Sequence, residues 1–170
     1  SKKNILDIGT GSGCVIISII KERENCKATA IDKSLKALKV AKLNAEMHHV
    51  QKKIKFLNID VDKYLANKYD LIVSNPPYIK DIEILSLDKD VKLNEPKLAL
   101  SGGKSGLNKV FKVIKKSQKL LKTNGKLILE IGDKQSKEVK KYLIKNNFNQ
   151  IRVFKDLSRK DRCIVSTKAN

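Results

Sequence analysis

Residues 69–78 constrain the fold of this chain most, because two prolines follow directly after a short apolar run. Residues 69–74 do not alternate between apolar and polar side chains, which is typical of a strand buried in a parallel sheet. Pro76 and Pro77 lack backbone N–H groups and fix their own φ angles, so the chain leaves the sheet in an extended turn. Asn75 is therefore predicted at the carboxyl end of a strand, where open α/β sheets bind ligands, with the aromatic ring of Tyr78 beside it.

A glycine-rich loop near the start of the chain predicts a nucleotide-binding unit. A strand at residues 4–8 leads into this loop, and an apolar helix follows. Glycines allow a backbone to approach a ligand, and the helix N-terminus offers free N–H groups. A dinucleotide fingerprint would need glycine at the position of Cys14. The pattern therefore favours a cofactor with an adenosine and an amino-acid tail. We predict that these residues bind it: Asp7, Gly9, Thr10, Gly11, Ser12 and Gly13.

Two acidic residues end the next two predicted strands. Residues 27–31 form the second predicted strand, and Asp32 follows it, 23 residues after Gly9. An acid there can accept hydrogen bonds from both hydroxyls of a ribose, and the alternative role is the N-cap of the next helix. Asp60 follows the third predicted strand at residues 53–58. It is placed to reach an adenine amino group, and a turn acid is an equally supported alternative.

The rest of the pattern predicts a doubly wound α/β fold. Residues 80–104 are irregular and form a candidate substrate-binding lid, because long loops inside compact domains are usually functional. A helix is expected to end near Asn124-Gly125, before a fifth strand. Residues 150–154 and 162–167 are two β-like runs that we expect to be antiparallel. Together these features predict a Rossmann-like, mainly parallel seven-stranded sheet with one antiparallel strand.

Composition limits the class of protein. The 170 residues suffice for one α/β domain and are few for two. The three cysteines are far apart and lack metal-site spacing, which indicates thiols in a reducing compartment, neither disulfides nor a metal site. No apolar run reaches membrane-spanning length. We therefore expect a cytoplasmic domain that does not contact membranes.

The charge leaves two interpretations open. The net charge is +19, from 37 basic and 18 acidic residues, and all but four of the basic residues are lysines. Such a charge favours salt-dependent contact with RNA, the ribosome or acidic proteins. A lysine-biased, solvated surface is the alternative, and the even spread of the lysines along the chain favours it.

Taken together, the motifs resemble those of class I S-adenosylmethionine-dependent methyltransferases. They are most similar to the HemK-type protein-(glutamine-N5) methyltransferases, which modify peptide chain release factors. The resemblance covers nearly the whole chain and lies in five segments: residues 7–13, 73–79, 95–103, 129–132 and 161–162. The Asn-Pro-Pro-Tyr tetrapeptide is shared with enzymes that methylate exocyclic amines of nucleic-acid bases. The segment Glu95 to Leu100 is what favours glutamine.

The resemblance implies that residues 1–170 are the catalytic domain of such an enzyme, with S-adenosylmethionine as cofactor and S-adenosylhomocysteine as product. The family normally carries an N-terminal helical domain that helps to recognise the release factor. This sequence starts at Ser1 without that domain, which suggests a piece of a longer protein. The implied cofactor residues add Asp32, Asp60, Val61 and Asn75 to the glycine loop, although relatives often have an aromatic residue at the position of Val61.

The chemistry implied by the resemblance depends on positioning, because an amide nitrogen is a poor nucleophile. The side-chain oxygen of Asn75 and the carbonyl of Pro76 would accept the two N–H bonds of the substrate amide. Tyr78 would pack against the planar amide. The predicted catalytic and substrate-binding residues are Asn75, Pro76, Pro77 and Tyr78.

Two other functions remain open at this stage. An adenine amino group is also a planar N–H₂ group that would fit the same acceptors, so an N6-adenine-type methyltransferase that acts on RNA or DNA is the main alternative. The net charge of +19 supports it. A catalytically silent module that binds RNA or a partner is a lesser alternative. The intact glycine loop and Asn75 argue against this module.

Overall fold

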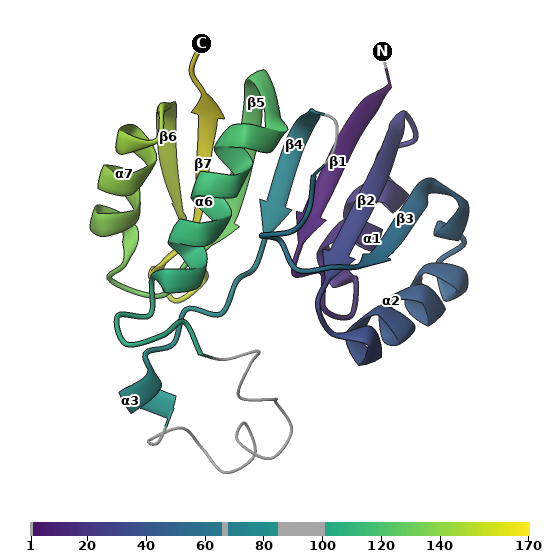
Figure 1. Ribbon diagram of the computed structural model, residues 1–170, viewed down its shortest axis with the longest axis horizontal. Coiled ribbons are helices and arrows are strands. Elements are labelled where there is room, and N and C mark those ends of the chain that lie inside the picture. The colour runs from purple at the N-terminus through teal and green to yellow at the C-terminus, as the bar shows by residue number, and fades with distance from the viewer. Residues whose placement is uncertain (1, 66–67, 85–100) are drawn as a thin grey trace.

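The computed structural model describes residues 2–65, 68–84 and 101–170 (Figure 1). The strands are β1 (Lys3–Ile8), β2 (Cys26–Asp32), β3 (Ile54–Asn58), β4 (Tyr69–Ser74), β5 (Leu121–Glu130), β6 (Phe148–Lys155) and β7 (Asp161–Lys168). The helices are α1 (Cys14–Glu22), α2 (Leu35–Met47), the 3-10 helix η1 (Gln51–Lys53), α3 (Asp81–Ile84), α6 (Asn108–Leu120) and α7 (Ser136–Lys145). The segment Glu95 to Leu100 and most of the predicted lid lie outside the described residues.

The strands form one seven-stranded sheet in the order β3-β2-β1-β4-β5-β7-β6. Strands β1 to β5 pair in parallel, and β7 runs antiparallel to both β5 and β6. The predicted mainly parallel sheet with one reversed strand is therefore confirmed. The carboxyl ends of the parallel strands meet at one edge of the sheet, which is the lower edge in Figure 1. Ligands bind at this edge in open α/β sheets.

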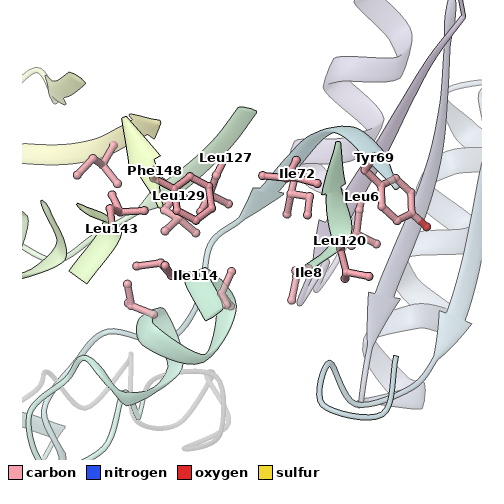
Figure 2. Packing of buried hydrophobic residues seen from close by; sticks show 14 of the residues in the cluster. Leu6, Ile8, Tyr69, Ile72, Ile114, Leu120, Leu127, Leu129, Leu143 and Phe148 are labelled. Atoms are coloured by element: carbon pink, nitrogen blue, oxygen red, sulfur yellow. The ribbon is translucent and has the colours of Figure 1, made fainter. Parts of the chain in front are cut away.

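Helices cover both faces of the sheet (Figure 1). On one face, α1 and α2 pack over an apolar cluster that includes Ile5 of β1. On the other face, α6 and α7 pack over a larger cluster that includes Leu6 and Ile8. Successive strand residues point to opposite faces, so one apolar strand supplies both clusters. Figure 2 shows the larger cluster, in which Ile114 of α6 and Leu143 of α7 lie over residues of the central strands.

The prediction that the helix before β5 ends near Asn124-Gly125 is wrong. Helix α6 ends at Leu120, and β5 begins at the next residue. Leu121 pairs with Tyr69 of β4, and the register then shifts before the ladder resumes. The φ angle of Asn124 is 62°. The Asn-Gly pair therefore lies at an irregularity inside β5. Residues with a positive φ angle are favoured at such strand irregularities as well as at helix ends.

The connection between β3 and β4 is short in the described part of the chain. Residues 59–65 contain a turn and no helix. Tyr64, from this connection, is buried and belongs to the larger cluster, which also contains α6 residues such as Val113.

None of the described helices has the length and apolar character needed to cross a membrane. Across residues 2–65, 68–84 and 101–170, no group of three His, Cys, Asp or Glu side chains is arranged to hold a metal ion.

Candidate active site

The glycine-rich loop leaves open space at the carboxyl end of β1. Gly9 and Gly11 have φ angles of 72° and 56°, in the left-handed region that other residues rarely adopt. A Cβ atom added to either residue would meet no atom within 4 Å. At Gly13 the added atom would lie 2.9 Å from Cδ1 of Ile17 and 3.2 Å from Cβ of Ala41. The first two glycines therefore leave room for a ligand, and Gly13 allows α1 and α2 to pack closely.

Asp7 lies buried beneath this loop, with a side chain that is only 2% exposed. Its Oδ2 atom accepts a hydrogen bond of 2.6 Å from the hydroxyl of Thr10, which is also buried. Burial raises the pKa of Asp7 to about 7, although the Thr10 hydrogen bond lowers it, and the charge of Asp32 raises it further. A cationic group bound above the loop would favour the ionised carboxylate, because an opposite charge lowers the pKa of an acid.

Asp32 joins the end of β2 to the glycine loop. Its Oδ2 atom accepts a hydrogen bond of 2.9 Å from the N–H of Gly11, and its Oδ1 atom accepts one of 2.8 Å from the N–H of Ser34. The N-cap of α2 is Ser34, whose hydroxyl accepts from the N–H of Ala37 over 3.2 Å. The structure thus assigns the cap to Ser34, and Asp32 is left to support the loop.

Asp60 and Val61 lie where the chain leaves β3. The Oδ1 atom of Asp60 accepts a hydrogen bond of 2.9 Å from the N–H of Asp62, which is the turn geometry named above as an alternative role. This bond is the largest cause that lowers the pKa of Asp60, and the Lys112 ammonium at 3.9 Å contributes as well. The carboxylate is still 41% exposed and can contact a ligand. Val61 packs against the larger apolar cluster.

The Asn-Pro-Pro-Tyr turn lies next to the glycine loop. Ser74, the last residue of β4, is buried and donates a hydrogen bond of 2.6 Å to the carbonyl oxygen of Ile8. This bond fixes the end of β4 beside the end of β1. The following residue, Asn75, is exposed, and no described residue makes a hydrogen bond with its side-chain amide. Pro76 is buried. The turn therefore presents a free amide group at the ligand-binding edge.

Tyr78 is held in place by Glu130 and Arg162, which belong to two of the family-like segments and for which the sequence predicted no role. Its hydroxyl donates to Oε1 of Glu130 over 3.0 Å and accepts from Nη1 of Arg162 over 3.3 Å. The guanidinium of Arg162 lies 5.9 Å from the centre of the Tyr78 ring, and its Nε and Nη2 atoms both donate to Asp156 over 3.1 Å. Burial, together with the charge of Glu130, raises the pKa of Tyr78, so the phenol remains protonated at neutral pH.

Gln135 fixes the main chain at the same point. Its Nε2 atom donates to the carbonyl oxygen of Tyr78 over 2.9 Å, and its Oε1 atom accepts from the N–H of Gly132 over 2.9 Å. A Cβ atom at Gly132 would lie only 3.0 Å from Cδ2 of Tyr78. The strand end at Glu130 and the start of α7 therefore enclose this tyrosine. No local sequence pattern indicated that Gln135 supports Tyr78, because the two residues are 57 positions apart.

The structure brings most of the predicted site residues together. Asp7, the glycine loop, Asp32 and Asn75 all lie at the carboxyl ends of adjacent strands β2, β1 and β4. Asp60 follows β3, the next strand outward. Tyr78 belongs to the same turn as Asn75, but its hydroxyl points toward β5 and β7.

Comparison with known proteins places this arrangement among methyltransferases. Residues 1–92 match the family described as "Methyltransferase small domain". The chain is 38% identical over 167 residues to the "Bifunctional methyltransferase" of Rickettsia felis, which covers 98% of this chain and 32% of that protein. It is 36% identical over 169 residues to the "Release factor glutamine methyltransferase" of Clostridium acetobutylicum, which covers 98% of this chain and 59% of that protein. The chain thus spans between about a third and three fifths of these curated relatives.

Solved structures share the fold at low sequence identity. A methyltransferase from Pyrococcus furiosus superposes with a TM-score of 0.73 at 19% identity, covering 100% of this chain and 77% of that one. A ribosomal protein L11 methylase from Lactobacillus delbrueckii subsp. bulgaricus gives 0.71 at 18% identity, covering 100% and 72%. These similarities confirm the methyltransferase fold that the motifs predicted.

Proposed function

We propose that this chain, which belongs to the methyltransferase small-domain family, transfers a methyl group from S-adenosylmethionine to the side-chain nitrogen of a glutamine in a peptide chain release factor. The observation that carries the proposal is the free amide of Asn75, held beside the glycine loop by the bond from Ser74 to Ile8. The relatives named release factor glutamine methyltransferases support the choice of substrate.

The residues at the edge of the sheet fit the proposed cofactor. The space above Gly9 and Gly11 would accept its amino-acid end, with the Asp7 carboxyl beneath. Each oxygen of Asp32 accepts one hydrogen bond from a backbone N–H group. A carboxylate oxygen can accept a second hydrogen bond, for example from a ribose hydroxyl. Asp60 and Val61 would border the adenine. When bound, S-adenosylmethionine supplies an electrophilic methyl group.

The turn after β4 would bind and orient the substrate amide. The side-chain oxygen of Asn75 and the carbonyl oxygen of Pro76 accept its two N–H bonds, which directs the nitrogen lone pair toward the methyl group. The bound cofactor would supply the methyl group to this nitrogen and leave as S-adenosylhomocysteine, and the methylated nitrogen would release its extra proton to water. Pro77 stiffens the turn, because its ring fixes φ. The ring of Tyr78, fixed by Glu130 and Arg162, lies beside the amide.

We also propose where the protein acts and which part of the enzyme this chain forms. Release factors act in the cytoplasm, and we place this protein there. Residues 1–170 form its catalytic domain. The product of the cofactor is S-adenosylhomocysteine.

Methyl transfer from labelled S-adenosylmethionine to an intact release factor tests the proposal, with total RNA as a parallel acceptor. We expect label on the release factor, and none when the glutamine of its Gly-Gly-Gln motif is changed to alanine. Asn75→Ala should abolish transfer and leave cofactor affinity within about twofold, because Asn75 contacts mainly the substrate. Asn149→Ala on the exposed face of β6 is the matched control and should behave like the wild type.

Each other outcome has a defined meaning. Full turnover by the Asn75→Ala variant would remove Asn75 from the mechanism. Label that appears on RNA alone would show that the turn binds a nucleic-acid base, and the glutamine proposal would be wrong. Absence of cofactor binding by the wild-type chain would identify a catalytically silent module.

A further inference from the structure

We infer that a groove along α6 binds single-stranded RNA, a role separate from the methyl acceptor proposed above. The groove has a volume of about 530 Å³. Four lysines and two aromatic residues make up most of its lining: Lys112, Lys115, Lys116, Lys119, Phe111 and Tyr142. Asp62 and Asn108 complete it. The net charge of +19 favours contact with RNA but does not indicate where RNA would bind, whereas the groove is a specific surface.

The lysines follow one another along a single face of the helix. Position 112 lies three and four residues before the adjacent positions 115 and 116, and 119 lies three residues after 116. The lysines therefore lie on the same side of the helix at intervals of about one turn, or ~5.4 Å. This places a row of cations along the groove at a spacing that suits a chain of phosphates better than one isolated anion. Counterion release from such contacts stabilises nucleic-acid complexes.

Most of this positive charge is not neutralised by neighbouring acids. Lys112 forms ion pairs with Asp62 and, over 3.9 Å, with Asp60. Lys116 donates over 3.0 Å to the main-chain carbonyl oxygen of Asp62, which leaves its charge uncompensated. Among the described residues, no acidic side chain lies within ion-pair distance of Lys115 or Lys119, and both lysines are exposed.

The two aromatic residues of the groove are half-buried against the larger apolar cluster, and we expect bases to stack on the part that stays exposed. The rings of Phe111 and Tyr142 are stacked, with centroids 4.0 Å apart and planes at 15°. One ring comes from α6 and the other from α7, and both line the groove next to the lysines. Nucleic-acid bases of any sequence stack on aromatic side chains, and this combination with a cationic groove is typical of single-strand binding.

These two features together favour a single strand of RNA over other anionic partners. A duplex keeps its bases stacked inside and would present only phosphates to the rings. An acidic peptide would pair with the lysines but would not require a stacked aromatic surface. The groove begins near the active site, because α6 starts two residues after Gly106, where an added Cβ atom would lie 2.6 Å from the carbonyl oxygen of Tyr78.

Fluorescence anisotropy with a labelled twelve-nucleotide single-stranded RNA tests the inference on the full chain. The double variant Lys115→Gln, Lys119→Gln should bind at least tenfold more weakly than the wild type. The slope of log affinity against log salt should fall in magnitude by about 1.4, as expected for two lost phosphate contacts to a single strand. Tyr142→Leu, which keeps an apolar side chain and removes the ring, should weaken binding about tenfold, within the range for one lost base stack.

A matched control separates the groove from general electrostatics. Lys36→Gln, Lys39→Gln removes the same charge from exposed positions of α2, on the opposite face of the sheet. We expect a change of less than threefold. Equal weakening by both double variants would overturn the inference, as would equal affinity for single-stranded and duplex RNA. Thermal unfolding of each variant verifies that it is folded.

The outcomes for the groove and for the proposed function are distinguishable. The Lys115→Gln, Lys119→Gln variant should still methylate a release factor, since neither lysine belongs to the active site. Methylation of the release factor without groove-dependent RNA binding would refute the groove alone. Groove-dependent RNA binding without methylation of the release factor would refute the proposed substrate alone. Groove-dependent binding of polyglutamate but not of RNA would overturn the inference in favour of an acidic protein.

Discussion

The hydroxyl of Ser74 donates a hydrogen bond of 2.6 Å to the main-chain carbonyl oxygen of Ile8. The two residues end β4 and β1, which are neighbours in the sheet. The chain turns from Ile8 into the glycine loop and from Ser74 into Asn75. This buried hydrogen bond adds to the pairing of β1 with β4 and helps to hold together the two segments that are proposed to bind cofactor and substrate.

Ser74→Ala should lower the free energy of unfolding by about 1–3 kcal/mol, because it leaves the buried carbonyl oxygen of Ile8 without this donor. Urea denaturation followed by circular dichroism measures the change. Ser18→Ala is the control, since the Ser18 hydroxyl also donates to a main-chain carbonyl oxygen, that of Cys14 over 2.8 Å, but on the exposed side of α1. Its effect should stay within about 0.5 kcal/mol. Equal effects would show that the hydrogen bond of Ser74 contributes nothing specific.

Asp32→Ala should weaken binding of S-adenosylmethionine by about 1–3 kcal/mol, because it removes the carboxylate that holds Gly11 and is proposed to bind the ribose. Isothermal titration calorimetry measures this affinity. Ser34→Ala removes the actual cap of α2 and leaves the Asp32 carboxylate in place. If the alanine at position 34 weakened cofactor binding as much as the alanine at position 32, the role of Asp32 would be limited to supporting the helix.

Asp7 should make the protein less stable as the pH rises from about 4 to about 7. Its pKa rises from 3.8 to about 7 on folding, chiefly because the side chain is buried. Between these values the folded state binds more protons than the unfolded state, so the stabilisation is fully present below about pH 4 and is lost toward pH 7. Asp7→Asn, which is neutral at every pH, should lack this decline.

Thermal unfolding at about pH 5 and about pH 8 tests this expectation. The difference in melting temperature between the two pH values should be smaller for Asp7→Asn than for the wild type. Asp133→Asn makes the same change in charge at an exposed position and should retain the wild-type difference. A decline of equal size in all three proteins would contradict a raised pKa of Asp7.

Arg162→Lys should lower the free energy of unfolding by at least about 1 kcal/mol and reduce methyl transfer. A lysine ammonium cannot reproduce the planar set of donors with which Arg162 contacts Asp156 and Tyr78. We expect a lower kcat with nearly unchanged cofactor affinity, because the ring of Tyr78 loses its fixed orientation. Arg152→Lys on the exposed face of β6 makes the same chemical change and should have no effect. An unchanged kcat for the Arg162 variant would make this network purely structural.

The strand ends and loops that carry the candidate site residues could be predicted because each of them is a short local pattern in the sequence. The strand Tyr69–Ser74 has the predicted bounds. A short apolar run favours a buried strand, and the two prolines that follow it cannot continue the ladder of hydrogen bonds. The end of α6 was predicted wrongly, because the left-handed conformation of Asn124 serves a strand irregularity as well as a helix end. Local signals of this kind cannot distinguish the two structures without knowledge of the neighbouring strand.

The support of Tyr78 could not be predicted for a different reason. Its hydroxyl makes hydrogen bonds with Glu130 and Arg162, which lie 52 and 84 positions further along the chain. No periodicity connects positions so far apart, and only the pairing of β5 with the reversed β7 brings Glu130 opposite Cys163, next to Arg162. The order of strands in the sheet therefore determines this part of the site.

The reversal of β7 also has a consequence for how the protein loses activity under stress. Because β7 runs antiparallel, its first residues reach the ligand-binding edge. Arg162 is supplied by the β6–β7 hairpin, and among the described residues the outer strand β6 has no neighbour on its far side. Peripheral hairpins open locally at lower free-energy cost than central strands. Enzymatic inactivation should therefore precede global unfolding, and amide hydrogen exchange should report the opening of this hairpin first.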